Sequence, residues 1–585
     1  TIGANVIRFA CGVDPWKGNV KRMHFSTVTL PDLRRAYENL EPFDAGQTEA
    51  GLTRHVLDWY YGINLSRALT SAMRIKRGKG TLSIGRVQGP ALKLIVDRER
   101  EIKAFVPMPY WELSIHLKGV EFMHTKGRFL DEAEADLSLE RTAAKAVVKS
   151  VERKEQAIPP QPCFDLTSLQ LEAYRVFRYS PSRTLELAQN LYEASLITYP
   201  RTSSQKIPPS INLSHIISDI SKDPEYAPMA KKLMENSWYA PMQGKKEDPA
   251  HPAIHPTGLH ARVDGAEKNL YDLIVRRFMA AFAPPARKER VRVEADAGGE
   301  PYAASGSRLV EKGWVEFYGK YYTTEDTELP VFAGGEILDV KDKKKARKET
   351  KPPKRYTEAS LVAELEERHL GTKATRSVIV ETLFKRGYVS GKSMEVSDFG
   401  LKVCEVLQKY APEILDENLT RKLEDEMEGI QEGRIDKDRV IQDGKEILVQ
   451  ILDKWKKNEA RIGADLLEAL KATEAQQVLV GQCDKCGKQL RIIRMKLGRQ
   501  FIGCSGYPEC RNAYPLPTGA SVSVTGKACP DCGKPTVNVK KARMRFTMCI
   551  DPNCPSKEKW NKGGSNEKDS RASGPGQGRP GPRRP

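Results

Sequence analysis

Two groups of residues in this 585-residue sequence have the types and spacing needed for chemistry: a tyrosine beside an arginine, and two sets of four cysteines. The tyrosine is Tyr199 in the stretch LITYPRTSSQKIP, followed by Pro200 and Arg201. Proline disfavours the α conformation for the residue before it, so Tyr199 is predicted to be extended, just after a helix ends. Residues i and i+2 of an extended chain share a face, which brings Arg201 beside the phenol.

A tyrosine in this setting could act as a nucleophile. An unperturbed phenol is almost wholly protonated at neutral pH, and a nearby guanidinium favours its ionised form. The same cation could stabilise charge on an attacked phosphate. Thr202, Ser203, Ser204 and Lys206 add hydroxyls and a second cation. On spacing alone a packed core tyrosine is the commoner outcome, so both interpretations stay open at this point.

The cysteines are arranged as two quartets near the end of the chain. The spacings are Cys483-x2-Cys486 with Cys504-x5-Cys510, and Cys529-x2-Cys532 with Cys549-x4-Cys554. Paired thiolates on two knuckles joined by a hairpin are typical of a tetrahedral zinc site. Each segment is too small for a core of its own, so metal binding would supply the folding energy. A redox CxxC pair is the alternative, but it does not account for two fourfold sets, so we predict two structural Zn²⁺ sites in a reducing compartment.

The composition indicates a folded protein of several domains with a polyanionic partner. The net charge is +18 and the pI about 9.2, which favours nucleic acid as the partner. Hydrophobic residues make up 39% and charged residues 29% of the chain. No run of about 18 apolar residues is present, so we expect no membrane partner.

Local patterns predict several further elements. Residues 48–69 read as a helix in which Arg54 and Asp58, four apart, could pair. The stretch GTLSIGRVQGPALKLIVDREREI places Arg86 and Gln88 near a helix N-terminus, which suits anions. Residues 110–165 and 260–340 alternate as strands do, and the basic run 341–355 is typical of a solvated connection. The stretches LYEASLI (191–197) and LFKRGYV (383–389) each end a helix and outline a helix-turn-helix with a hairpin wing, with an ordinary helical hairpin as the alternative for either.

Four stretches, in this order, together resemble motifs of the type IA DNA topoisomerases, and are most similar to the archaeal members. They are LSIGRVQGPALKLIVDREREI, LYEASLITYPRTSSQKIP, HPAIHPTG (251–258) and GTKATRSVIVETLFKRGYV (371–389). The resemblance covers essentially residues 1–555. It shifts the interpretation of Tyr199 from a core residue to a nucleophile.

The resemblance implies a multidomain α/β and mainly α fold: a type IA torus with winged-helix-like modules and a strand-rich arch, followed by two zinc ribbons. The expected parts are a TOPRIM remainder (1–65), a helical base domain with a DNA-binding groove (66–110 and 345–465), the arch (111–165 and 262–344), the active-site tyrosine domain (166–261), ribbons at 478–518 and 525–556, and a disordered basic tail (557–585).

The resemblance also implies residue roles. Tyr199 would attack a DNA phosphodiester and hold the 5′ end, without ATP, in relaxing negatively supercoiled DNA. Arg201 would position the tyrosine and the phosphate, and His251 would have a proton or phosphate role. Arg86 and Gln88 match the single-strand-binding motif, and Lys206 and Arg376 are further DNA-contact candidates. The segment HPAIHP departs from the bacterial pattern, with Pro252 and His255 where Glu and Arg are expected.

The expected partners are single-stranded and negatively supercoiled DNA, bound by a monomer in the cytoplasm at the nucleoid. The family also uses Mg²⁺, held by an Asp-x-Asp-x-Glu-Gly-Glu run directly before a helix like TIGANVI. This run is not in the 585 residues, so the chain alone is expected to bind DNA without relaxing it. Two alternatives are a non-catalytic nucleic-acid-binding protein of winged helices and zinc ribbons, and the topoisomerase half of a reverse gyrase.

Overall fold

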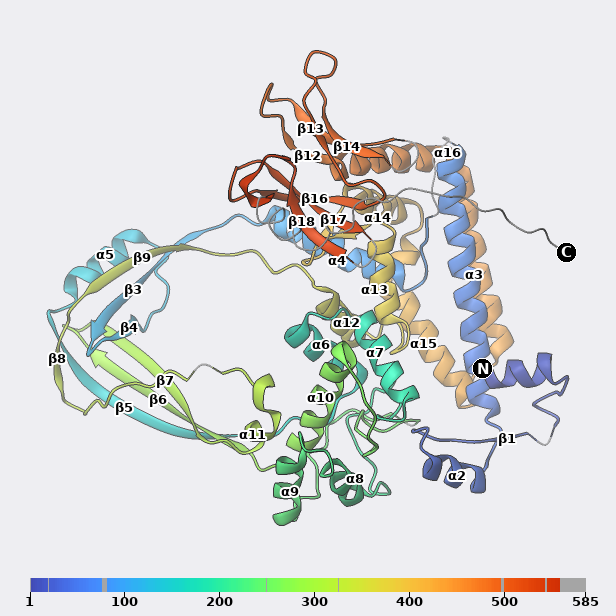
Figure 1. The fold of residues 1–585 in the computed structure, drawn as a ribbon, viewed down its shortest axis with the longest axis horizontal. Helices are drawn as coiled ribbons and strands as arrows, with labels where there is room; N and C mark the ends of the chain where they lie inside the picture. Colours follow the sequence, from blue (N-terminus) through green and yellow to red (C-terminus); the bar gives the residue numbers. More distant parts are fainter. Residues whose placement is uncertain are drawn as a thin grey trace, which may run out of the picture. The chain divides into compact units, whose positions relative to one another are not determined.

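The structure is a computed structural model that describes residues 2–18, 20–75, 82–248, 250–324, 326–495, 499–541 and 544–557 (Figure 1). The chain forms two compact units, residues 1–466 and 467–585, which are described separately. No helix in these described ranges is long and apolar enough to cross a membrane.

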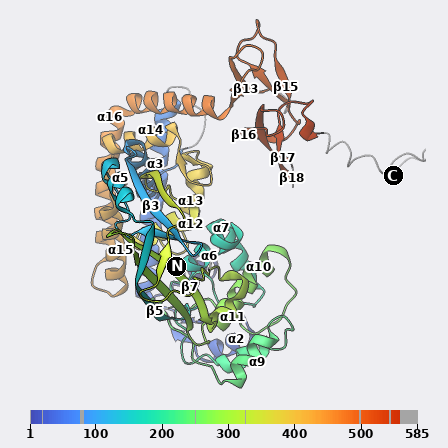
Figure 2. The ribbon, with the colours of Figure 1, turned by 90° about the vertical axis from the view of Figure 1, so that its left-hand side faces the viewer.

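A seven-stranded antiparallel sheet forms the strand-rich part of the first unit. Its order is β8-β5-β6-β7-β4-β3-β9. Its core includes Leu113, Phe122, Val293 and Tyr302, and α5 (Glu132–Arg141) packs against β3, as Figure 2 shows. The strands are β3 (Pro109–Leu117), β4 (Val120–His124), β5 (Lys145–Ile158), β6 (Ala286–Asp296), β7 (Pro301–Glu311), β8 (Ile337–Asp339) and β9 (Lys343–Glu349).

The basic run at 341–355 is not a solvated connection, as the charge pattern predicts, but contains the edge strand β9. This strand pairs with β3 from Lys343 opposite Ile115 to Glu349 opposite Pro109. Charge does not prevent strand formation here, because the backbone pairs with β3 while Lys345 and Lys348 form ion pairs with Asp136 and Glu112. Lysines on an edge strand also discourage pairing with a second chain.

The tyrosine-bearing part is a helical cluster around one buried core. Its helices are α6 (Leu166–Phe177), α7 (Pro181–Glu193), α8 (Leu213–Ile220), α9 (Ala227–Glu235), α10 (Gly265–Ala280), α11 (Trp314–Tyr318) and the 3-10 turn η2 (Gly319–Tyr321). Asp165 caps α6 in a capping box, and Ser180 caps α7 with Pro181 in its first turn. The sheet does not begin at the expected boundary of 262, because α10 packs against α7 and α9.

A second helical part carries the longest helices. It contains α3 (Ala45–Ile75), α4 (Gln88–Ala104), α12 (Glu358–Glu367), α13 (Arg376–Lys385), α14 (Asp398–Tyr410), η3 (Pro412–Leu415), α15 (Glu417–Gln431) and α16 (Lys437–Gln477). The hairpin of β10 (Val389–Ser390) and β11 (Glu395–Val396) follows α13, as a winged helix requires. After α7, in contrast, the described residues up to α8 form no hairpin, and Ile197 makes an isolated bridge with Pro256.

The N-terminal segment contains α1 (Ile2–Asn5), the π-helical turn η1 (Val6–Ala10), β1 (Lys21–Arg22), α2 (Leu30–Glu38) and β2 (Glu41–Pro42). The sheet is joined to both helical parts: α4 leads into β3 and β9 leads to α12, while β5 leads to α6 and α10 leads into β6. Because α6 and α7 also contact α12 and α13, the three parts close on one another.

The second unit holds two small sheets that share one hydrophobic core, which includes Val480, Leu490, Val537 and Ile550. Lys534 of the second ribbon binds Asp484 of the first at 3.1 Å and Asp551 at 2.8 Å. The strands are β12 (Leu479–Gln482), β13 (Gln489–Arg494), β14 (Gln500–Cys504), β15 (Ala513–Pro515), β16 (Ser521–Ala528), β17 (Pro535–Lys541) and β18 (Met544–Cys549), followed by η5 (Pro555–Lys557). The predicted disordered tail lies outside the described residues beyond 557.

Candidate active site and metal centres

Tyr199 lies in an irregular segment that begins where α7 ends at Glu193. Leu196, Ile197 and Thr198 before it are buried. Thr198 is held from both sides, because its N–H donates to the carbonyl of His255 at 3.0 Å and its hydroxyl donates to Ala253 at 3.1 Å. The buried residues fix the backbone, and the partly exposed phenol follows immediately.

Arg201 lies beside the phenol, as the Tyr-Pro-Arg spacing predicts. Its Nη1 is 3.4 Å from the Tyr199 hydroxyl and donates to Oε1 of Gln189 on α7 at 2.8 Å. Among the described residues its Nε and Nη2 have no partner, so the N–H groups on these two nitrogens can donate to an anion. The guanidinium is therefore oriented by α7 while part of it stays available.

His251 lies on the other side of the tyrosine. The two ring centroids are 4.6 Å apart, and Nδ1 of His251 is buried without a hydrogen-bond partner in the described chain. Burial lowers the pKa of His251 to about 4; the positive charges of Lys373 and His24 act in the same direction, while Asp248 opposes them. The imidazole is therefore neutral at physiological pH.

Asp248 links the tyrosine segment to the second helical part. Its carboxylate accepts from the N–H of Ser203 at 3.1 Å and from the hydroxyl at 2.9 Å, and it forms an ion pair with Lys373. Burial would raise the pKa of Asp248, but the bonds from Lys373 and Ser203 outweigh it and hold that pKa at about 2. Lys373 belongs to the GTKATR stretch, three residues from Arg376.

The N-terminal segment contacts the same site. The N–H of Tyr199 donates to the carbonyl of Ser26 at 2.9 Å. His24 donates from Nε2 to the carbonyl of Ala250 at 2.7 Å, and its Nδ1 is 3.3 Å from a carboxylate oxygen of Glu41. Both partners of His24 are acceptors, so the two bonds form together only when the ring carries two protons.

His255 and Pro252, the two departures from the bacterial pattern, are buried beside this segment. His255 is 2% exposed and stacks on Phe278, and its Nδ1 donates to its neighbour's carbonyl at 2.8 Å. Burial lowers the pKa of His255 to about 4. It packs as a neutral side chain against Phe278.

Arg86 does not lie open to solvent. It is 6% exposed and pairs with Asp58 at 2.9 Å and Glu424 at 3.1 Å. Arg54 also binds Glu424, at 2.5 Å, instead of the Asp58 predicted four residues along its helix. Burial alone would lower the pKa of Arg86. The negative charges of Asp58 and Glu424 outweigh this effect, so the pKa of Arg86 is raised. Sequence spacing could not show this, because Glu424 is 338 residues away in the chain.

The other DNA-contact candidates differ in accessibility. Gln88 begins α4 and donates to the carbonyl of Ser83 at 3.1 Å. Lys206 binds the exposed Glu247 at 2.6 Å, so it can exchange partners easily. Arg376 instead donates to the carbonyls of Leu370 and Gly371, and burial lowers its pKa. It stabilises the turn before α13, and its third partner is Glu366, at 3.8 Å.

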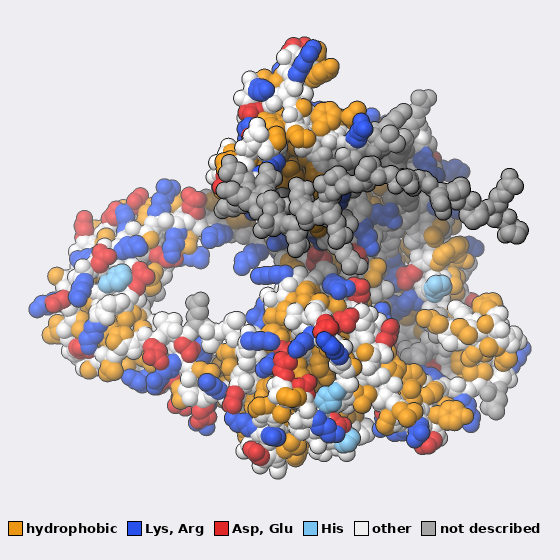
Figure 3. Space-filling view, in the orientation of Figure 1, with side chains coloured by type: hydrophobic (Ala, Val, Ile, Leu, Met, Phe, Trp, Pro, Cys, Tyr) orange, Lys and Arg blue, Asp and Glu red, His pale blue; other side chains and the backbone are white. Residues whose placement is uncertain are grey.

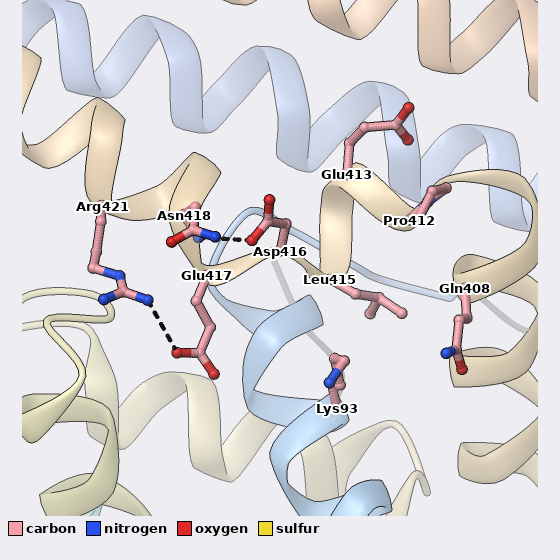
Figure 4. Close-up of a pocket in the computed structure, with 9 residues that line it drawn as sticks. All are labelled: Lys93, Gln408, Pro412, Glu413, Leu415, Asp416, Glu417, Asn418 and Arg421. Atoms are coloured by element: carbon pink, nitrogen blue, oxygen red, sulfur yellow. Dashed lines mark hydrogen bonds and ion pairs between the residues drawn. The ribbon is translucent and has the colours of Figure 1, made fainter.

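A pocket of about 590 Å³ in the second helical part is lined by residues whose described interactions are structural (Figure 4). Arg421 pairs with Glu417 at 3.6 Å, and Asp416 accepts from the N–H of Asn418 at 2.9 Å. Lys93 on its wall is paired with Asp97. Helix capping and surface ion pairs account for most of its polar groups, although Oε2 of Glu413 has no partner among the described residues. Tyr199 is not among its lining residues.

The cysteines form the two predicted tetrads. Each set of four sulfur atoms lies within 4.8 Å of one another: Cys483, Cys486, Cys504 and Cys510 in one, and Cys529, Cys532, Cys549 and Cys554 in the other. Asn512 donates to Cys483 at 3.3 Å and to Asp484 at 2.6 Å, so the first tetrad also has an outer hydrogen-bond partner. Four thiolates at this spacing fit a closed zinc site.

Comparison with known proteins decides the family. A model described as DNA topoisomerase matches residues 43–442, and one described as topoisomerase DNA binding C4 zinc finger matches residues 480–519 and 526–563. The chain belongs to the type IA DNA topoisomerases. The alternative of a nucleic-acid-binding protein without a topoisomerase domain is thereby set aside, and the two ribbons match zinc-binding modules.

Relatives and a solved structure agree with this family. The topoisomerase is 45% identical to DNA topoisomerase 1 of Pyrococcus horikoshii over 94% of this chain and 82% of the relative. It is 44% identical to that of Methanocaldococcus jannaschii over 95% and 72% of the two chains. The full-length topoisomerase I of Thermotoga maritima shares the fold, with a TM-score of 0.61 at 24% identity over 85% of this chain and 80% of that one.

Sequence reasoning missed four residues around the topoisomerase tyrosine: Gln189, His24, Asp248 and Lys373. Two signals were present, because Asp248 precedes His251 by three residues and Lys373 lies within the fourth motif. Neither signal names a partner, since Asp248 and Lys373 are 125 residues apart. The described residues around Tyr199 do not fit the Mg²⁺ site that the resemblance implies. The carboxylates of Asp248 and Glu41 are already paired, with Lys373 and Arg22.

Proposed function

We propose that Tyr199 is the nucleophile of this topoisomerase and that Arg201 is its positioning and charge-stabilising partner. The observation that supports this most directly is the contact of Arg201 Nη1 with the Tyr199 hydroxyl at 3.4 Å. Gln189 fixes that guanidinium through Nη1, which leaves the N–H groups of Nε and Nη2 for phosphate oxygens. A charge-assisted bond to an oxyanion is stronger than a neutral one, so the arrangement favours the attacked phosphate.

The proposed reaction is a pair of transesterifications. The Tyr199 oxygen attacks phosphorus, the bond from phosphorus to the 3′ oxygen breaks, and the phenolic proton leaves while the 3′ oxygen gains one. The 5′ end is then held as a phosphotyrosine. In the reverse step the 3′ hydroxyl attacks, and the phenol is released. One ester replaces another in each step, so neither consumes ATP.

His251 contributes a neutral imidazole to this step. Because its pKa is about 4, it carries no charge that would compete with Arg201 for the phosphate. Its contact with the tyrosine ring restricts the phenol, and its ring nitrogens can exchange a proton with the reacting oxygens. The Asp248–Lys373 pair holds the segment after Tyr199 in place, so both are positioning residues.

We infer that the substrate is single-stranded and negatively supercoiled DNA, bound by a monomer at the nucleoid. The net charge of +18 supports a polyanionic partner. Figure 3 shows Lys and Arg side chains along the strand-rich part and over the helices, interspersed with acidic ones. Arg86, Gln88 and Lys206 are the candidates for contacts to the strand.

Magnesium, which the family resemblance implies, would need ligands other than the residues described here. In the described ranges the groups that could hold an ion are the two cysteine tetrads. No step is therefore assigned to it. The tetrads instead fold the ribbons, whose exposed Arg491, Tyr507 and Arg545 suit stacking and backbone contacts with a single strand.

The test is a matched pair of variants, Tyr199→Phe and Tyr192→Phe. Tyr192 packs edge-on against Tyr199 at 5.1 Å, so both changes remove one hydroxyl from the same cluster. Labelled single-stranded DNA should form a covalent adduct with the wild type and with Tyr192→Phe, and none with Tyr199→Phe, which should still bind. An adduct that survives in Tyr199→Phe would refute the proposal.

A further inference from the structure

A pocket of about 550 Å³ lies between the N-terminal segment and the tyrosine-bearing part. One wall comes from residues 24–35, where α2 begins, and the other mainly from residues 208–219 and 252–259, around α8. None of the three side chains of the proposed reaction lines it. Its volume falls within the range of small-molecule sites in proteins, so the chemistry of its lining indicates what it could hold.

The lining is largely apolar and changes from exposed to buried along the pocket. Leu30 and Leu259, on opposite walls, are 61% and 45% exposed, whereas Ile216 is buried. Ring side chains are frequent in the lining and suit a flat ligand: Phe25, Pro31, Pro208 and Pro252. A ligand that covers the two leucines removes apolar surface from water, which favours its binding.

The lining carries no surplus of positive charge. Arg35 is its one arginine or lysine, and it pairs with Asp32. The other carboxylate of the lining, Asp219, pairs with Lys222 at 2.6 Å. A phosphate group would find no free arginine or lysine here, so the pocket suits an uncharged ligand better than an anion.

One buried polar atom of the lining lacks a partner. Nδ1 of His255 donates to the carbonyl of Pro256 at 2.8 Å, so Nε2 of the neutral ring is an acceptor. His255 is 2% exposed, and among the described lining residues its Nε2 is the one buried side-chain nitrogen or oxygen without a hydrogen bond. An unpaired buried acceptor is unfavourable, so a ligand that donates a single hydrogen bond would be stabilised there.

The pocket is also continuous with the backbone that holds the tyrosine. Ser26 lines it, and its carbonyl accepts the N–H of Tyr199 at 2.9 Å. Thr198 lines it as well, and its hydroxyl accepts the N–H of His255 at 3.1 Å. A ligand that contacts both walls would therefore stabilise the arrangement in which the N-terminal segment holds Tyr199.

We propose that this pocket binds a small, flat, uncharged ligand that carries a ring N–H, with that N–H donated to Nε2 of His255. Its apolar rings cover Leu30 and Leu259, and its single donor satisfies the one unpaired acceptor of the lining. The absence of free arginine and lysine among the described lining residues separates this ligand from the DNA strand. Binding does not use the hydroxyl of Tyr199, so the inference goes beyond the proposed function and does not depend on it.

The test compares two probes, indole and benzofuran, which have the same shape but differ in that benzofuran has an oxygen where indole has its N–H. In an NMR titration of the 585-residue chain, the wild type should bind indole about threefold to tenfold more tightly, the value of one neutral hydrogen bond. His255→Phe keeps a buried ring and removes the acceptor, so it should bind both probes equally. A wild type that does not prefer indole would overturn the inference.

A second pair of variants avoids any change in the buried core. Leu30→Ser with Leu259→Ser removes apolar surface from the exposed end of the pocket. Leu130→Ser with Leu137→Ser is the control, because these leucines are 74% and 52% exposed and do not line the pocket. The first double variant should bind indole about fivefold more weakly than the wild type, and the control should not differ from it. Equal affinities of the two double variants would contradict the proposed site.

Two further measurements separate the ligand from DNA and the pocket from the tyrosine chemistry. Displacement of indole by a single-stranded oligonucleotide, but not by an abasic one of the same length, would overturn the inference, because the pocket would then take a base of the strand. The Leu30→Ser, Leu259→Ser variant should form the covalent adduct as the wild type does. Absence of the adduct in the wild type would count against the proposed function, while the preference for indole would still decide the inference.

Discussion

The imidazole of His251 lies against the phenol ring of Tyr199, with centroids 4.6 Å apart and the ring planes tilted by 51°. This contact joins residues that are 52 positions apart in the chain, on segments that are paired through Thr202 and the carbonyl of His251 at 3.0 Å. Because burial lowers the pKa of His251 to about 4, the tyrosine has a neutral neighbour on this side and a cation, Arg201, on the other.

The first prediction concerns the pH dependence of cleavage. The ratio of adduct-formation rates of the wild type and His251→Gln should stay constant from pH 8 to about pH 5.5, because a His251 with a pKa of about 4 does not titrate there. Rapid quenching with labelled oligonucleotide measures both rates. A ratio that falls severalfold as the pH drops through 6.5 would show that His251 titrates as an ordinary histidine and would contradict the neutral assignment.

The second prediction concerns Lys373. Lys373→Gln leaves Asp248 buried without its cation, so the pKa of Asp248 should rise from about 2 and stability should fall by about 3 kcal/mol. Adduct formation should also slow, since Asp248 holds Ser203 in the tyrosine segment. The control is Lys385→Gln, which removes only an exposed pair with Glu381. Urea unfolding and adduct assays should show a lower unfolding free energy and a slower adduct formation for Lys373→Gln than for Lys385→Gln. Equal values for the two variants would show that the Lys373–Asp248 pair contributes no more than an exposed ion pair.

The third prediction concerns acid stability. His255 has a pKa lowered from 6.5 to about 4, so the unfolded chain takes up a proton between these values that the folded chain does not. The contribution of His255 to the free energy of unfolding is fully present above pH 6.5. It decreases by about 3 kcal/mol as the pH falls towards 4. The stability difference between the wild type and His255→Gln should therefore shrink by that amount between pH 7.5 and pH 4. A difference that does not change with pH would contradict the lowered pKa.

The fourth prediction concerns Arg86. Since Asp58 and Glu424 bind this guanidinium, DNA must compete with them. Asp58→Asn should tighten single-strand binding about threefold to tenfold, or about 1 kcal/mol, while Arg86→Gln should weaken it. Asp453→Asn, which removes an exposed carboxylate from α16, controls for the change in net charge. Weaker binding by Asp58→Asn would mean that the ion pair orients Arg86 for DNA.

The fifth prediction concerns the ribbons. Metal analysis of reduced protein should find about two zinc ions per chain, one for each tetrad. Cys483→Ser with Cys486→Ser should lose one ion and also loosen the second ribbon, because both ribbons share one core and the Lys534–Asp484 pair. Adduct formation by Tyr199 should persist. Protein that contains no zinc would contradict the predicted metal content. A second ribbon that resists proteolysis equally well in the variant would contradict the predicted coupling between the two ribbons.

The sequence by itself determined the local features of this topoisomerase. The Tyr199-Pro200-Arg201 spacing placed a guanidinium beside the phenol, because proline restricts the preceding residue and alternate residues share a face. The cysteine spacings determined both tetrads, because knuckles and hairpins are local structures. The start of the helix at Gln88 followed from its glycines and its apolar period.

Only the tertiary structure decided which distant residues complete the site. Asp248 and Lys373, Arg86 and Glu424, and Tyr199 and His251 are brought together by packing across separate parts of the chain, and no local pattern encodes those pairings. Burial also determined the state of two histidines, since a lowered pKa depends on surroundings that sequence does not give. The basic run became the edge strand β9 for the same reason: a partner strand 234 residues away supplied the hydrogen bonds that its own sequence could not predict.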